Sequence, residues 1–202
     1  MNPKSRSELL REQFAEETVI RAADLARRGF SGAYLQAALK QGIVERLGRG
    51  LYTVPGAQTT EKHHFVQVAR RVPNAVICLM SALIFHQFTT QLPNSVWFAI
   101  GSKDWMPKLD FVKYKVFRFS GAALTEGIQT HRIEGTEVRV YSPAKTVADL
   151  FKYRNKIGED VAWEALREAL REKLCTVDEL VHFGKICRVD NVMKPYFTAA
   201  LA

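Results

Sequence analysis

The chain has few of the features that mark secreted and membrane proteins. Its 202 residues include three cysteines, Cys78, Cys175 and Cys187, an odd number without a C-x-x-C pair. Unpaired thiols suit a reducing cytoplasm. No apolar run approaches the roughly 18 residues that span a bilayer, and the N-terminal segment lacks the apolar core of a signal peptide. The sequence therefore predicts a cytoplasmic protein without a membrane partner.

Several catalytic motifs are also missing. Gly48-Arg49-Gly50 has neither the spacing nor the following helix start of a phosphate-binding glycine loop. His63 and His64 are adjacent, so on a helix their rings would diverge by about 100 degrees, and no histidine or cysteine follows at the spacing of a zinc site. There is no G-x-S-x-G motif for a serine nucleophile. The sequence therefore predicts a protein that binds no cofactor, has no metal site and is not an enzyme.

One enzymatic alternative stays open. Asp110 and Glu137, with Arg139 two residues after the glutamate, resemble the carboxylate pair with which some nucleases hold Mg²⁺. Arginine is too basic to exchange protons, and a charged hairpin that alternates between solvent and core has the same pattern. The two carboxylates therefore define a metal-dependent nuclease as an alternative hypothesis.

The composition is that of a folded, basic protein. Hydrophobic residues make up 47% of the chain, enough for a full core, and 29 Lys and Arg against 21 Asp and Glu give a net charge of +8. A basic protein is attracted to polyanions, but net charge alone does not locate a site.

The most informative stretch runs from Ser31 to Pro55. Ser31 is a good N-cap for a helix to Gln41, Gly42 is suited to end that helix, and Gly48-Arg49-Gly50 predicts a tight turn between two short strands. Ala22 to Arg28 predicts the preceding helix, and the turn around Gly29 is typical of a helix-turn-helix. A helix pair followed by a basic hairpin predicts a winged helix.

The second helix of this pair has an inner and an outer face. Leu35, Ala38 and Leu39 share the inner face. The outer face carries small, amide and basic side chains, which allow a close approach to a DNA groove and contacts to bases and phosphates. The hairpin adds two arginines, which are suited to phosphates or a minor groove. The predicted DNA-binding positions at this stage are Ala33, Gln36, Ala37, Lys40, Gln41, Arg46 and Arg49.

The remainder of the chain predicts a second domain. Pro55 to Thr60 is rich in small and turn-forming residues, so we expect a winged-helix domain over residues 1–57 and a C-terminal domain over residues 58–202. Alternating apolar and polar residues between Phe111 and Tyr141 predict strands, including a hairpin around Glu134-Gly135-Thr136. Helices follow from Ser142 onward: Ser142 is suited to cap a helix with Pro143 at its first position, and Thr176 with Glu179 three residues on forms a capping-box pattern. The predicted fold class is α+β: a winged helix-turn-helix, then a mixed α/β domain that ends in helices.

Segments from both parts resemble a known family. RGLYTVPGA, RRVPNAVICLMSALIFHQFTTQLPNSVWFAI, FRFSGAALTEGIQTHRIEGTEVRVYSPAKTVADLFKYRNKIG and ICRVDNVMKPY are similar to the AbiEi antitoxins and transcriptional regulators of bacterial type IV toxin-antitoxin systems. The similarity extends from about Val19 to Tyr196, and the order of residues from Ser142 to Gly158 is its most specific part.

The resemblance implies a function for each domain. The winged helix would bind inverted repeats in the operon's own promoter through the helix from Ser31 to Gln41 and the hairpin, with Tyr52 beside Arg46 and Arg49. The C-terminal domain would counter a nucleotidyltransferase-like toxin, mostly without a stable complex. Its implied antitoxin surface carries Lys145, Lys152, Arg154 and Lys156, although Lys145, Asp149 and Lys152 also have the spacing of residues that pair along a helix. A winged helix that only docks proteins is a further alternative.

Overall fold

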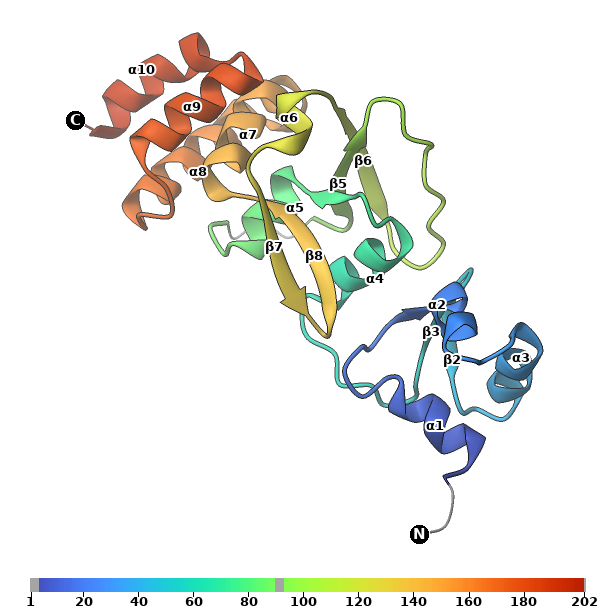
Figure 1. Ribbon diagram of the computed structural model, residues 1–202. Helices are drawn as coiled ribbons and strands as arrows, with labels where there is room; N and C mark the ends of the chain where they lie inside the picture. Colours follow the sequence, from blue (N-terminus) through green and yellow to red (C-terminus); the bar gives the residue numbers. More distant parts are fainter. Residues whose placement is uncertain (1–3, 90–92, 202) are drawn as a thin grey trace. The chain divides into compact units, whose positions relative to one another are not determined.

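The computed structural model describes residues 4–89 and 93–201, and the chain divides into two compact units (Figure 1). The first unit combines Met1–Asn74 with Pro107–Lys113 and His131–Val138. The second combines Ala75–Met106, Tyr114–Thr130 and Arg139–Ala202. The first unit thus continues beyond residue 57, the end of the predicted N-terminal domain, and takes in two segments that are distant in sequence.

The first unit contains a winged helix followed by one more helix. The elements are α1 (Arg6–Glu12), β1 (Ile20–Arg21), α2 (Ala22–Arg27), α3 (Gly32–Lys40), β2 (Glu45–Gly48), β3 (Leu51–Thr53) and α4 (His63–Arg71). The three strands form an antiparallel sheet in the order β1-β3-β2. The sequence predicted only the β2 and β3 pair, because a strand of two residues such as β1 has no periodicity to detect.

The winged helix has a hydrophobic core of its own. Nine buried side chains form one cluster that draws on the first three helices and the sheet: Leu10, Phe14, Ile20, Leu25, Phe30, Leu35, Ala38, Val44 and Tyr52. All of these residues lie before the predicted boundary at residue 57. Residues 10–54 therefore supply the whole hydrophobic core of the winged helix.

The second unit is built on a mixed sheet. Its strands are β4 (Val76–Ile77), β5 (Val96–Gly101), β6 (Tyr114–Phe119), β7 (Ile128–Ile133) and β8 (Thr136–Tyr141), in the order β6-β5-β4-β8-β7. β5 runs parallel to β6 and antiparallel to β4, and β4 runs parallel to β8. Two short helices, α5 (Leu79–Phe85) and α6 (Ala122–Thr125), lie between strands in the chain.

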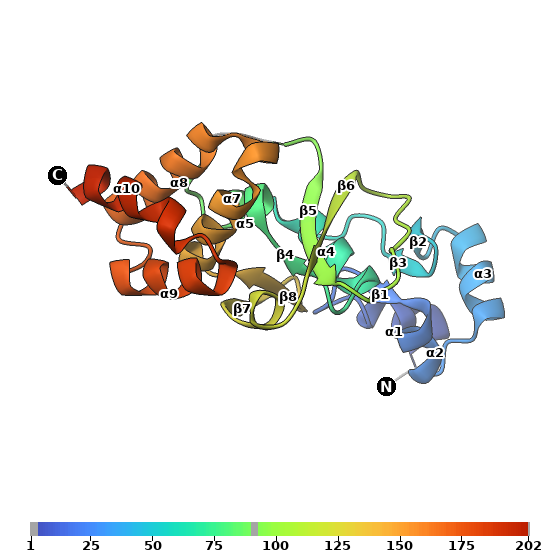
Figure 2. The same ribbon diagram turned by 90° about the horizontal axis from the view of Figure 1, so that it is seen from above.

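Four consecutive helices complete the second unit and gather at one side of its sheet (Figures 1 and 2). They are α7 (Pro143–Ile157), α8 (Glu159–Arg171), α9 (Val177–Cys187) and α10 (Asp190–Leu201). The capping signals in the sequence are confirmed: the Ser142 hydroxyl accepts from the backbone N–H of Lys145, and Thr176 and Glu179 form a reciprocal capping box. The predicted α+β fold class is confirmed.

The β7–β8 hairpin is shared between the units, since its tip, His131–Val138, belongs to the first unit. Glu134 and Gly135 both have positive φ, as a two-residue type I′ turn requires. Within the first unit, the buried Glu134 carboxylate accepts hydrogen bonds from the backbone N–H of Thr60 (2.7 Å), from the Thr60 and Thr18 hydroxyls, and pairs with Nδ1 of His63 (2.7 Å). These bonds fix the segment before α4.

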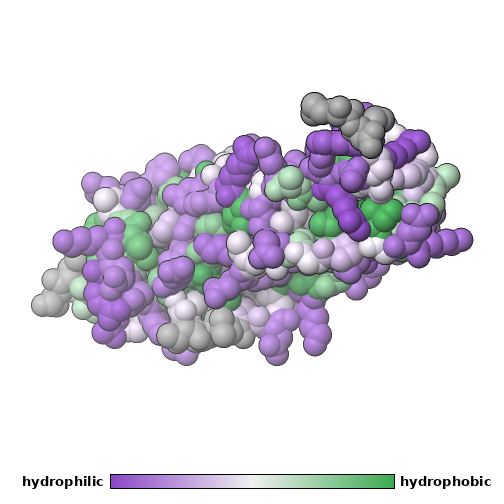
Figure 3. All heavy atoms as spheres, turned by 90° about the horizontal axis from the view of Figure 1, so that it is seen from below, coloured by the Kyte–Doolittle hydropathy of each residue, from purple (hydrophilic) through white to green (hydrophobic). Residues whose placement is uncertain are grey.

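No helix within residues 4–89 and 93–201 is both long and apolar enough to cross a membrane. The face of the molecule in Figure 3 is mostly hydrophilic, and its apolar residues form small separate patches.

Candidate DNA interface

The helix-turn-helix is closed by two matching glycine turns. After α2, Gly29 (φ +91°) donates to the carbonyl of Ala26 and Phe30 donates to that of Leu25. After α3, Gly42 (φ +66°) donates to Leu39 and Ile43 to Ala38. Both sets of bonds form a Schellman motif, in which glycine adopts the left-handed conformation at no steric cost. The glycine stop predicted at Gly42 is confirmed, and these turns fix the direction in which α3 begins and ends.

α3 has the two faces that the sequence predicted. Its N-terminus is capped by the Ser31 hydroxyl, which accepts from the backbone N–H of Tyr34. Leu35 and Ala38 are buried in the winged-helix core, whereas Leu39 is only partly buried. The side chains predicted to face DNA are all exposed: Ala33, Gln36, Ala37, Lys40 and Gln41. α3 therefore presents a narrow face of small, amide and basic groups to solvent.

The wing is formed by β2, the turn at Gly48-Arg49-Gly50 and β3. The pairing register shifts between Arg46 and Gly48, which marks a β-bulge, and Gly50 has a φ of +74°. Arg46 and Arg49 are exposed. Arg46 donates to the carbonyl of Gly48 (3.3 Å), and Arg49 forms no salt bridge with any described residue. The wing thus carries positive charge that no carboxylate neutralises by direct pairing.

Tyr52 is a correction to the predicted interface. Its side chain is only 5% exposed and belongs to the winged-helix core, so it does not lie on a surface that DNA can reach. β3 is the central strand of the three-stranded sheet, between β1 and β2, and all three of its residues are buried. Both faces of β3 are therefore covered, and the alternation of buried and exposed side chains found in a strand with one solvated face does not apply here.

A group of arginines near α2 was not identified from the sequence. Arg21, Arg27, Arg28 and Arg70 line a hollow of about 420 Å³ together with Asp24. Asp24 is nearly buried and accepts from Arg21 (2.8 Å) and from Arg27, while Glu17 accepts from Arg28 and Arg70 (both 2.9 Å).

The two carboxylates of this group stay charged. The hydrogen bond from Arg21, with a contribution from Arg27, lowers the pKa of Asp24. Burial by itself would raise the pKa of Glu17, but Arg70 and Arg28 together lower it. Each of the four arginines pairs with one of the two carboxylates, so the group forms a structural network that keeps a net positive charge.

The carboxylates of the nuclease hypothesis are both exposed. Asp110 lies against the wing, since a Cβ atom on Gly48 would come within 2.6 Å of its Oδ1 atom and 2.4 Å of the Phe111 ring. Glu137 lies on β8. Within the described part of the chain, no group of three or more His, Cys, Asp or Glu side chains is arranged to hold a metal ion. Two exposed carboxylates without further ligands make a weak metal site.

The implied antitoxin surface needs one correction. Lys145 is fully buried, and its Nζ atom lies 2.6 Å from Oδ2 of Asp149. The spacing of Lys145 and Asp149 thus corresponds to an ion pair along the helix, and Lys145 presents no charge to a partner. Lys152 and Lys156 are exposed, and Arg154 is partly buried with one N–H donated to the carbonyl of Phe151 (2.8 Å).

The comparisons with known proteins agree with this architecture. Residues 9–55 match the family model described as transcriptional regulator, AbiEi antitoxin, which confirms the resemblance over the winged helix. No curated protein matches the chain in sequence. The crystal structure of the RV2827C protein from Mycobacterium tuberculosis is similar in fold, with a TM-score of 0.57 and 14% identity over 88% of this chain and 69% of that one. At this identity the likeness shows the fold alone.

Proposed function

We propose, from the AbiEi antitoxin match over residues 9–55, that this chain is a transcriptional regulator that binds its own promoter and represses it. The observation that carries the proposal is that the matched residues are those that build the winged helix and its core. DNA would be contacted by the exposed face of α3 and by the wing. Lys40, Arg46 and Arg49 form no salt bridge with any residue that the structure describes, so they are available for phosphates.

The test is a gel-shift titration on the upstream region of the gene and on random DNA of equal length. Arg49→Ala removes a phosphate contact, so it should weaken binding to both DNAs and reduce the slope of log K against log salt by about one. Gln36→Ala removes a base contact, so it should weaken binding to the promoter by about 1–3 kcal/mol and leave random DNA unaffected.

Arg171→Ala is the matched control, because Arg171 is an exposed arginine on α8, in the other unit. It should bind both DNAs like the parent. Parental affinity in Arg49→Ala and Gln36→Ala alike would contradict the assignment of α3 and the wing. A winged helix that docks a protein instead of DNA predicts a different result, in which neither the parent nor the variants shift the promoter.

The C-terminal part is proposed to supply the antitoxin activity, by countering a nucleotidyltransferase-like toxin without a stable complex. We propose the division at residues 57 and 58 because the winged-helix core is complete within residues 10–54. Residues 1–57 should then shift promoter DNA without protecting cells, and residues 58–202 should restore growth beside a toxin-expressing plasmid. Circular dichroism would first establish that each fragment folds. Rescue of growth by residues 1–57 alone would contradict this division.

The proposed regulator is not an enzyme. The alternative nuclease would use the exposed pair Asp110 and Glu137, and it predicts nicking of plasmid DNA in the presence of Mg²⁺ or Mn²⁺ that disappears in Glu137→Ala. We expect no nicking by the parent, because two carboxylates without a third ligand bind a divalent cation weakly. Metal-dependent nicking that is lost in Glu137→Ala would contradict the proposed regulator function and support the nuclease hypothesis.

A further inference from the structure

The second unit contains a hollow whose charged lining is of one sign. The hollow has a volume of about 690 Å³. Three parts of the unit border it: the segment from the end of β6 to the start of α6, the middle of α7, and the end of α9. Its charged lining residues are Lys152, Arg154 and Arg188, and its apolar lining includes Ala122, Ile186 and Val189. Three of these side chains are cationic and none is acidic.

None of the three cations forms a salt bridge with a described carboxylate, although Lys152 acts electrostatically on Asp149. Lys152 and Arg188 are exposed, and neither forms a salt bridge or a side-chain hydrogen bond with any described residue. The thiol of Cys187, which lines the hollow, donates to Oδ1 of Asp149 (3.2 Å), but the other oxygen of Asp149 is paired with the buried Lys145. The nearby buried carboxylate is therefore already matched by a lysine of its own.

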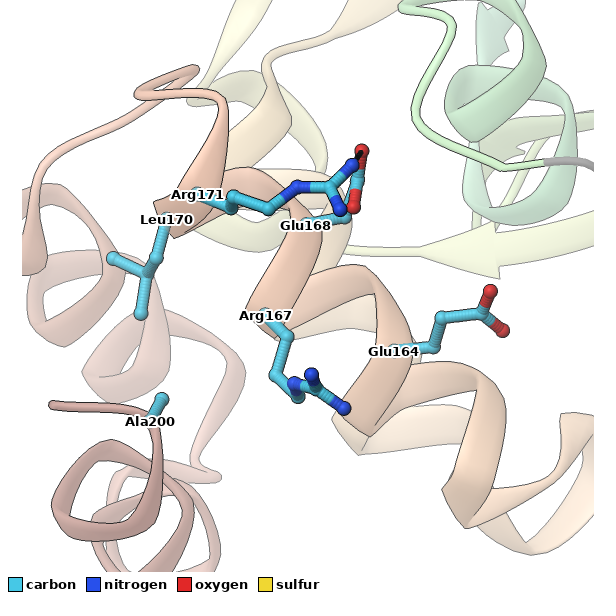
Figure 4. A pocket seen from close by; sticks show the side chains of 6 residues that line it. All are labelled: Glu164, Arg167, Glu168, Leu170, Arg171 and Ala200. Atoms are coloured by element: carbon cyan, nitrogen blue, oxygen red, sulfur yellow. Dashed lines mark hydrogen bonds and ion pairs between the residues drawn. The ribbon is translucent and has the colours of Figure 1, made fainter. Parts of the chain in front are cut away.

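Two other hollows of the molecule differ in this respect. The hollow near α2 has Asp24 among its arginines. The hollow of about 600 Å³ between α8 and α10 is lined by Glu164, Arg167, Glu168, Leu170, Arg171 and Ala200, and Figure 4 shows the Arg171 guanidinium directed at the Glu168 carboxylate. Mixed charge of this kind is expected of a solvated helix surface. The hollow around Lys152 and Arg188 is distinguished by its unmatched positive charge.

Arg188 is held at the rim in an unusual backbone conformation. It caps α9 with φ +59° and ψ +44°, a left-handed geometry in which glycine is favoured over other residues. Its backbone N–H donates to the carbonyl of Lys185, and that of the next residue, Val189, donates to Gly184. A guanidinium is thus kept at a position where the backbone alone would favour glycine.

The lining also offers an apolar wall. The partly buried Ile186 and the buried Val189 line the hollow together with the small side chains of Ala122 and Ala123. Arginine and lysine bind phosphate groups through charge-assisted hydrogen bonds, and a flat aromatic base can lie against an aliphatic wall. A volume of about 690 Å³ is in the range of pockets that hold small organic ligands.

We propose that this hollow binds a nucleoside polyphosphate, with its phosphates at Lys152, Arg154 and Arg188 and its base against Ile186 and Val189. This site is separate from the proposed DNA-binding surface, because every residue that lines it belongs to the second unit. It gives a ligand-binding role to two of the basic residues that the family resemblance placed on the antitoxin surface, Lys152 and Arg154.

The test is isothermal titration of the full chain with ATP, GTP and inorganic tripolyphosphate. We expect saturable binding of at least one nucleotide, and about tenfold weaker binding in Lys152→Gln and in Arg188→Gly, since each loses a charged hydrogen bond. Arg188→Gly should keep or raise the unfolding temperature, because glycine suits the left-handed conformation, so its loss of binding would not come from misfolding. Lys194→Gln, which changes an exposed lysine of α10 outside the hollow, should bind like the parent.

Three results would overturn the proposal. The first is that the parent binds neither ATP nor GTP at millimolar concentration. The second is that Lys152→Gln and Arg188→Gly bind the nucleotide with the affinity of the parent. The third is that tripolyphosphate binds as tightly as either nucleotide, which would leave no role for the apolar wall. Promoter binding measured on the same preparations separates this outcome from failure of the regulator proposal, because the DNA assay depends on residues of the first unit.

Discussion

The buried pair of Lys145 and Asp149 on α7 gives the sharpest test of how the second unit is held together. Both side chains are almost completely buried, at 0% and 1% exposure, and their charged atoms are 2.6 Å apart. Nζ of Lys145 also lies 4.2 Å from the centroid of the Tyr141 ring and 4.9 Å from that of Phe119. Cys187 supplies a further hydrogen bond to Asp149. Each charge is therefore satisfied only while the other is present.

Lys145→Met keeps an unbranched side chain, one heavy atom shorter than lysine, and removes its charge. Asp149 would then be buried without a cation, a change that costs about 3–5 kcal/mol in other proteins. For a chain of this length, each kcal/mol lowers the unfolding temperature by about 2–4 °C. We expect Lys145→Met to unfold roughly 10 °C below the parent at pH 8. Lys156→Met, at an exposed position on the same helix, is the matched control and should stay within about 0.5 kcal/mol of the parent.

The double variant distinguishes the cost of an unpaired buried charge from the loss of the ion pair itself. Lys145→Met combined with Asp149→Asn contains no buried charge, so it should recover more than half of the stability that Lys145→Met loses. The loss should also depend on pH. Burial raises the pKa of Asp149 in the folded protein, and removal of Lys145, which acts against that rise, raises it further.

The sign of this pH dependence follows from the raised pKa. A folded state with the higher pKa binds a proton more readily than the unfolded chain, so stability is retained below the unfolded pKa and is lost as pH rises through the folded value. Lys145→Met should therefore be closer to the parent at pH 5 than at pH 8 in thermal and urea unfolding. The reasoning would be refuted by a loss below 1 kcal/mol at pH 8, or by a double variant no more stable than Lys145→Met.

Four further outcomes follow from individual contacts. Ser31→Ala removes the N-cap of α3 and should cost about 1 kcal/mol in urea unfolding, with Ser31→Thr close to the parent. Gly42→Ala meets no atom within 4 Å but forces alanine to a φ of +66°, so thermal unfolding should show a loss of about 1–2 kcal/mol; an unchanged midpoint would remove the role given to the Schellman turn. Tyr52→Phe should leave promoter affinity unchanged in the gel shift, since the residue is buried, and a tenfold loss would return it to the interface. Burial alone would raise the pKa of Glu134, but hydrogen bonds from Thr18, Thr60 and His63 lower it. The stability that the Glu134 carboxylate contributes is therefore present above its unfolded pKa and is lost as pH falls through its folded pKa. The difference in unfolding temperature between the parent and Glu134→Gln should accordingly narrow below about pH 4.3.

The sequence by itself determined the features that depend on neighbours three to five residues apart. Ser31 and Gly42 bound α3, and Thr176 with Glu179 caps α9, because caps and Schellman turns use backbone groups of the same helical turn. The outward face of α3 was predictable for the same reason, since side chains on one side of a helix recur every three or four residues. The wing followed from a glycine turn between two short strands.

Only the tertiary structure decided the features that depend on residues distant in sequence. Tyr52 is buried because it packs into the winged-helix core, and Lys145 is buried because the first turn of α7 lies against the Phe119 and Tyr141 rings of the sheet. The same applies to the hollow at Lys152 and Arg188, which are 36 positions apart in the chain. Local propensity gives no sign of such contacts, since the free energy that forms them comes from burial and charge pairing between elements that meet only after folding.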